Sequence, residues 1–137
     1  MTRIVTGRAP YQKAEKVEPK TRKPMRRVSR KKAAQTQENA AYIAAVRGLP
    51  CCACGVANQS EAHHPRCKPP ASEPHAYKRI PGAGIRSHDQ DAIPLCRPCH
   101  TRFHLHRTDW VADHGPDYGF IPSTRAAVAA MIGEIEF

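Results

Sequence analysis

The sequence predicts a small α+β domain with flanking helices and a disordered, basic N-terminal arm. Three observations support this: the 137-residue length suits one modest domain, two C-x-x-C pairs stand 41 residues apart, and the net positive charge is confined to one end. Residues 1–36 hold 12 Lys/Arg and 2 Asp/Glu, whereas residues 37–137 hold 10 of each. We therefore expect an arm over 1–36, a folded domain over 37–122 and a C-terminal helix over 123–137 packed on that domain.

The arm is predicted to be disordered because it has too few large apolar side chains to offset the entropy of ordering it. Its positive charge suits a polyanion such as DNA. The candidate DNA-binding residues are Arg22, Lys23, Arg26, Arg27, Arg30, Lys31 and Lys32. A solubilising or targeting tail is the alternative interpretation, because short basic runs serve those purposes as well.

The first predicted helix covers residues 36–47, which are rich in alanine. It places Tyr42, Ile43 and Val46 on one side, and Gly48 can end it. These three side chains are expected to face the core.

A long loop rich in proline and glycine follows over 65–90, and loops of this length in a compact domain are often functional. The next segment, DAIPLC, is expected to be extended. A helix is predicted over 97–107, because His100 and His104 then share one face. Pro98 would lie in its first turn, where proline is tolerated.

Ser123 is expected to cap the final helix, since serine is a common N-cap residue. Its buried side is predicted to carry Val128, Met131 and Ile132. No run of about 18 apolar residues occurs, so no membrane-spanning segment is expected.

The cysteines form two pairs that are typical of a metal site. The start MTRIVTGRAPYQK lacks the apolar core of a secretory signal, so we expect reduced thiols rather than disulfides. Cys51 and Cys54 form one C-x-x-C pair, and Cys96 and Cys99 form the other. Four thiolates can close a tetrahedral zinc site with no open position, which predicts structural zinc. A redox dithiol is the alternative, but its strand–helix context is not seen.

Several cysteines and histidines fall outside these patterns. Cys52 could replace Cys51 as a ligand, although C-x-C chelates less favourably. Cys67 has no evident partner and is expected to be a buried or loop thiol. His88 and His106 are expected to be surface residues, because a loop or a helix end solvates an imidazole easily.

Four histidines offer a second candidate metal site. His100 and His104 lie four apart and share one face of the predicted helix, a spacing that binds metal in other proteins. His63 and His64 are adjacent, and neighbouring side chains of an extended segment point to opposite faces. One of this pair can therefore bind a metal while the other faces a substrate, giving three ligands and one base.

These motifs, in this order, resemble the HNH, or ββα-metal, nuclease family over about residues 51–106. A closer similarity is to the phage recombination-enhancement nucleases that depend on the RecA recombinase. It rests on a basic arm followed by VRGLPCCACG, EAHHP, GIRSHDQDAIPLCRPCH and FHLHRTDWVADHG. The resemblance implies a zinc-braced, metal-dependent endonuclease that cuts DNA phosphodiesters, with single-stranded or RecA-coated DNA and RecA as partners. It also implies a cytoplasmic location in a bacterial host cell, with the gene carried by a phage or prophage.

The resemblance further implies residue roles. His64 corresponds to the general base, and an exchange of its role with His63 stays open. The ligands of a catalytic divalent ion, Mg²⁺ first with Mn²⁺ or Zn²⁺ as alternatives, are implied to be His63, His100 and His104. Asp89 or Asp91 stands where the family has its middle Asn or acidic residue: Asp91 matches the HNH spacing before Cys96, and Asp89 matches the narrower family.

Two other functions compete with a recombination nuclease. One is a non-catalytic zinc module that binds DNA or assists recombination. The other is an HNH factor in phage DNA packaging. The joint presence of four histidines at metal-binding spacing argues against the first, because a purely structural zinc module needs only the cysteines.

Overall fold

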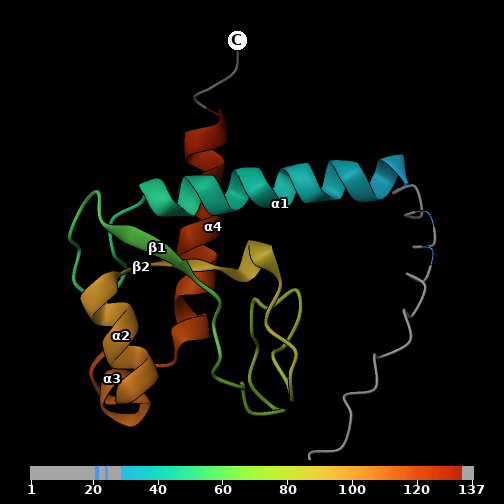
Figure 1. The fold of residues 1–137 in the computed structure, drawn as a ribbon. Coiled ribbons are helices and arrows are strands. Elements are labelled where there is room, and N and C mark those ends of the chain that lie inside the picture. Colours follow the sequence, from blue (N-terminus) through green and yellow to red (C-terminus); the bar gives the residue numbers. More distant parts are fainter. Residues whose placement is uncertain (1–20, 22–23, 25–28, 134–137) are drawn as a thin grey trace, which may run out of the picture.

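The computed structural model describes residues 21, 24 and 29–133, which form a small α+β protein, as predicted (Figure 1). The elements of this described part are α1 (Arg30–Gly48), β1 (Ser60–His63), η1 (Asp89–Asp91), β2 (Ile93–Cys96), α2 (Arg97–Leu105), α3 (Arg107–His114), η2 (Asp117–Phe120) and α4 (Ile121–Gly133), where η denotes a short 3₁₀ helix. Within these residues, no helix combines the length and the apolar character needed to cross a membrane.

Helix α1 begins at Arg30, earlier than the predicted start at Thr36. The Ser29 hydroxyl accepts a hydrogen bond from the Lys32 backbone N–H at 3.3 Å and so caps the helix. Lysine, alanine and glutamine, which fill the first turns, all favour helix. The end of the arm predicted to be disordered is therefore helical, and most of the rest of 1–36 lies outside the described residues.

Helix α1 packs on the sheet and on α4 through the side that its sequence predicted. Tyr42 and Val46 are buried, and the Tyr42 hydroxyl donates to the carbonyl oxygen of Ala92 at 3.3 Å. Gly48 ends the helix where it meets α4, and a Cβ there would lie 3.3 Å from the Met131 Cε. Figure 1 shows that α4 crosses α1 within the C-terminal half of α1.

Strands β1 and β2 form an antiparallel pair, with Ser60 opposite Cys96 and His63 opposite Ile93. Ile93–Cys96 form the strand β2, which confirms the extended segment that the sequence predicted. All four of its residues are buried. Helix α2 starts directly after Cys96 and ends at Leu105, slightly before the predicted end. Helix α2 then runs back along β1, because the His63 ring packs against Phe103 of α2 with ring centroids 4.6 Å apart.

The core of the described residues has two parts. The larger cluster joins the sheet to α2, α3 and the start of α4, and consists of Cys51, Tyr77, Ile93, Leu95, Cys96, Phe103, Trp110 and Ile121. The smaller cluster joins α1 to α4 and consists of Tyr42, Val46, Ala92 and Val128. Two cysteines of the predicted zinc site thus lie inside the larger cluster.

The predicted start of the last helix at Ser123 is wrong, because α4 already begins at Ile121. The Ser123 hydroxyl lies inside the first turn and donates to the carbonyl of Phe120, the residue before the helix, rather than capping the helix. Val128 is buried as predicted, but Met131 is only partly buried and Ile132 is 50% exposed. The last turns of α4 extend past α1, which leaves this end of the helix without a partner among the described elements (Figure 1).

Candidate functional site

Four cysteine sulfur atoms meet where the turn after α1 approaches the end of β2 and the start of α2. Each of Cys51, Cys54, Cys96 and Cys99 offers one sulfur, and these atoms lie within 4.8 Å of one another. The Sγ atoms of Cys54 and Cys96 are 3.6 Å apart. Zinc–sulfur bonds of about 2.3 Å in a tetrahedron place the sulfurs about 3.8 Å apart. The cluster could therefore hold a structural metal such as zinc.

The local backbone prepares the first cysteine pair for a metal. The Gly55 N–H donates to the Cys51 carbonyl at 2.8 Å, and Gly55 has a φ of 78°, in the left-handed region that favours glycine. Burial opposes ionisation of the Cys51 thiol, but hydrogen bonds from the backbone of Cys54, Cys96 and Ala53 lower its pKa to about 7. A thiolate near neutral pH is the form that binds zinc.

Cys52 and Cys67 lie outside this cluster. Burial, and next the neighbouring Cys51, raise the pKa of Cys52 to about 12. Burial also raises the pKa of Cys67 to about 11. Neither sulfur belongs to the group of four sulfur atoms that lie within 4.8 Å of one another, so neither is assigned as a metal ligand.

Three imidazoles form a second cluster on the other end of α2. His63 comes from the last position of β1, while His100 and His104 come from one face of α2. One ring nitrogen from each lies within 4.8 Å of the others. The ring centroids of His63 and His100 are 4.9 Å apart, and those of His100 and His104 are 4.8 Å apart. The structure thus brings together the three histidines predicted to share a metal.

Two carboxylates that sequence analysis missed hold two of these rings. The His63 Nε2 lies 3.1 Å from Asp117 Oδ2, and the His100 Nδ1 lies 2.8 Å from Glu61 Oε2. A carboxylate on one ring nitrogen fixes the imidazole and leaves the other nitrogen for a metal. Glu61 could have been suspected, because it lies two residues before His63 on the same face of β1. No local sequence pattern links Asp117 to His63, because the two residues are 54 positions apart.

Asp117 is a fully buried acid that organises the exit from β1. Its carboxylate accepts the backbone N–H groups of Arg66 at 2.7 Å and Cys67 at 3.0 Å, in addition to its contact with His63. Burial opposes its ionisation, but these hydrogen bonds hold its pKa below the ordinary value. Burial also lowers the pKa of His63, so the ring is neutral at neutral pH, as a metal ligand must be.

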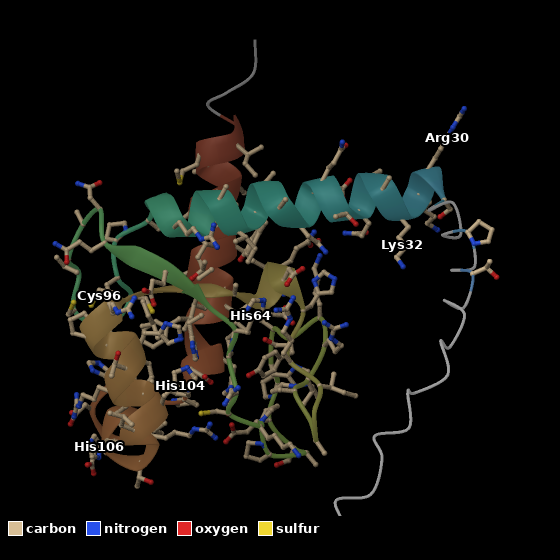
Figure 2. The ribbon with its side chains drawn as sticks, viewed as in Figure 1. Arg30, Lys32, His64, Cys96, His104 and His106 are labelled. Atoms are coloured by element: carbon tan, nitrogen blue, oxygen red, sulfur yellow. The ribbon has the colours of Figure 1, made fainter. Side chains whose placement is uncertain are left out.

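His64 reaches a different place from His63. It lines a cavity of about 380 Å³ between α1 and the long loop, together with Thr36, Arg47 and Arg86. Its Nε2 lies 2.9 Å from the Oδ1 atom of Asp89, and its side chain is 22% exposed. The hydrogen bond from His64, and more weakly the Arg86 charge, keep the pKa of Asp89 below its usual value. Figure 2 shows His64 beneath α1 and away from His104.

Asp91 lies in a different environment from Asp89. It is fully buried and forms an ion pair with Arg125 of α4. Its carboxylate also accepts the backbone N–H groups of Lys78, Arg79 and His88, at 2.9, 3.1 and 3.1 Å. These contacts tie the middle and the C-terminal end of the long loop to α4. Of the two aspartates considered for the middle position, Asp89 is therefore the one that contacts the paired histidine.

Replacing Asp91 by alanine is expected to lower the free energy of unfolding by about 3–5 kcal/mol, because it leaves the Arg125 charge without its buried partner. Asp89→Ala should cost less than about 1 kcal/mol, since Asp89 is partly exposed and its ion pairs are screened. Urea denaturation followed by circular dichroism measures both. Equal losses in the two variants would contradict the separate roles.

The other residues singled out from sequence lie at the periphery. His88 caps η1 by accepting the Gln90 backbone N–H at 3.1 Å, and His106 is exposed between α2 and α3. Three of the candidate DNA-binding residues are exposed in the first turn of α1, namely Arg30, Lys31 and Lys32. The other four, Arg22, Lys23, Arg26 and Arg27, lie outside the described residues.

Comparison with known proteins identifies one family. Residues 11–129 match the model of a family described as protein of unknown function, DUF968. No curated protein and no solved structure matched the chain.

Proposed function

The chain belongs to the DUF968 family, and we propose that it is a metal-dependent endonuclease of the HNH type that cuts DNA phosphodiesters. The observation that carries the proposal is the cluster of three imidazoles, together with His64, which directly follows His63 in the sequence and lines an open cavity of its own. Three ligands leave coordination positions open for water and phosphate, whereas four thiolates close a site. We therefore assign catalysis to the imidazole cluster and a structural role to the thiolate cluster.

His64 is proposed to accept the proton of the attacking water. Its contact with Asp89 through Nε2 orients the ring and leaves Nδ1 available as the base. His63, His100 and His104 would hold a divalent ion, whose positive charge would stabilise the negative charge that develops on the phosphate and the leaving oxygen. Glu61 and Asp117 keep the ligand rings in position.

The choice of metal and substrate is tested together. Imidazole donors suit transition metals more than Mg²⁺, so Mn²⁺ and Zn²⁺ belong in the assay beside Mg²⁺. We propose RecA-coated DNA as the substrate, on the resemblance of the motifs to RecA-dependent nucleases. The assay follows cutting of supercoiled plasmid and single-stranded circles with each ion, with and without RecA and ATP.

Metal-dependent cutting that RecA increases and EDTA abolishes is the expected result. Absence of cutting under every condition would favour a non-catalytic zinc module that binds DNA. Stimulation by a phage terminase instead of RecA would favour a role in DNA packaging.

DNA affinity should depend on Lys32 more than on Arg30, although both are exposed in the first turn of α1. Lys32 precedes Thr36 by one helical turn, and Thr36 lines the cavity that contains His64. In Figure 2 Lys32 points to the His64 side of α1, while Arg30 points away. The logarithm of the DNA association constant falls as log salt rises. Lys32→Gln is expected to make this negative slope shallower by about 1, and Arg30→Gln by much less. Fluorescence anisotropy with labelled duplex measures both, and equal slopes would show that this face of α1 is not a DNA contact.

A further inference from the structure

A second cavity, of about 390 Å³, lies between the long loop and the start of α3. Three arginines line it, Arg66, Arg86 and Arg107, and we call it the arginine pocket. Resting on the proposed function, we infer that the arginine pocket binds a phosphate group of the DNA strand that flanks the cleaved bond. It would position that strand across the imidazole cluster without reading its sequence.

The charge of the arginine pocket is poorly neutralised. Arg86 pairs with Asp89 at 3.3 Å, but none of the salt bridges between described residues involves Arg66 or Arg107. The three side chains come from three segments: the exit of β1, the long loop and the start of α3. Guanidinium groups form paired hydrogen bonds with phosphate oxygens and are hydrated more weakly than ammonium groups. An anion with several oxygens is therefore the ligand that fits this cavity.

The arginine pocket adjoins the imidazole cluster. The backbone N–H of Arg66 donates to the same Asp117 oxygen that holds His63. The Arg107 guanidinium carbon lies 5.1 Å from the centre of the Phe103 ring, which packs edge-on against His63 with centroids 4.6 Å apart. Phosphates bound at the pocket and at the imidazoles would therefore belong to one short stretch of strand.

One further observation links the arginine pocket to His64. Arg86 lines both the arginine pocket and the cavity of His64, so the two cavities share one wall. A strand in the pocket could continue past Arg86 to the proposed base.

The remaining wall of the arginine pocket leaves room for a nucleic-acid backbone. Gly82 and Ile85 exchange two backbone hydrogen bonds, at 2.9 and 3.0 Å, and make a tight turn. A Cβ on Gly82 or Gly84 would meet no atom within 4 Å, so this backbone borders open space. Pro81 and Ile85 add apolar surface. Arginine contacts to phosphate carry no direct sequence information, which predicts binding independent of base sequence.

The test removes one charge at a time in the non-cutting His64→Ala background. Arg66→Gln and Arg107→Gln are compared with Arg102→Gln, which removes the same charge from α2 where Arg102 pairs with Asp113. Binding of a fluorescein-labelled 20-base-pair duplex is measured from about 50 to 200 mM salt. The logarithm of the association constant falls as log salt rises. Each pocket variant is expected to make this negative slope shallower by about 0.9, and the control should leave it nearly unchanged. Arg66→Lys and Arg107→Lys should keep most of the slope.

Two assays separate failure of the inference from failure of the proposed function. In the cutting-competent protein, each pocket variant should raise KM several-fold while kcat stays within about twofold, because it loses binding rather than chemistry. If the wild type cuts DNA and the pocket variants bind and cut like Arg102→Gln, the inference falls and the function stands. If the wild type cuts no DNA with any metal, yet the pocket variants lose slope, the pocket remains a DNA site and the nuclease proposal falls.

Discussion

Cys96→Ser is expected to abolish binding of the structural zinc ion that we assign to the thiolate cluster, and to unfold the domain. Cys96 is 2% exposed and belongs both to the thiolate cluster and to the larger core cluster. Structural zinc contributes roughly 10–16 kcal/mol in small zinc domains, which is as large as the whole stability of a typical domain, about 5–15 kcal/mol. Losing one of four thiolates should therefore abolish cooperative folding. Elemental analysis after dialysis against EDTA, with thermal unfolding by circular dichroism, measures the effect.

Cys52→Ser and Cys67→Ser are the matched controls, because each removes one thiol of the same segment or core without touching the thiolate cluster. Both should retain the zinc ion and a melting temperature close to that of the wild type. A wild-type protein that contains no tightly bound zinc would overturn the assignment. Loss of zinc in Cys52→Ser with retention in Cys51→Ser would instead move the ligand to the neighbouring thiol.

His64→Ala is expected to slow DNA cutting by about 10²–10⁴-fold, the usual contribution of a general base. Folding and metal content should not change, because His64 belongs to neither metal cluster and its side chain is partly exposed. DNA binding should also survive. Rates are measured as nicking of supercoiled plasmid in the presence of the metal that supports wild-type cutting, with RecA present.

His106→Ala is the control for His64→Ala, since it removes an exposed imidazole outside both clusters. The cutting rate of Asp89→Asn should fall between those of His64→Ala and His106→Ala. The amide keeps a contact with His64 but loses the charge that orients the ring. Undiminished cutting by His64→Ala would refute its role as base. If His63→Ala alone kept its metal and lost cutting, the roles of the two neighbours would have to be exchanged.

Local spacing accounts for what could be predicted about the two clusters. The turn of a C-x-x-C pair brings its sulfurs together, and residues four apart on α2 share one face, so Cys96, Cys99, His100 and His104 could be placed from the sequence. The buried side of α1, with Tyr42 and Val46, followed from the same periodicity. The start of α1 was predicted too late, because its basic first turns were assigned to the disordered arm. Lysine and arginine are good helix formers, so a basic stretch can still be helical.

The sequence alone therefore determined the α+β class, the ligand types and the pairing of near neighbours, because helix and strand periods relate adjacent residues directly. Only the tertiary structure decided that Asp117 holds His63, that Glu61 holds His100, and that Asp89 rather than Asp91 contacts His64. It also decided that Arg66, Arg86 and Arg107 line one cavity. These contacts are made across the irregular 65–90 loop or between separate elements, where no period links sequence distance to distance in space.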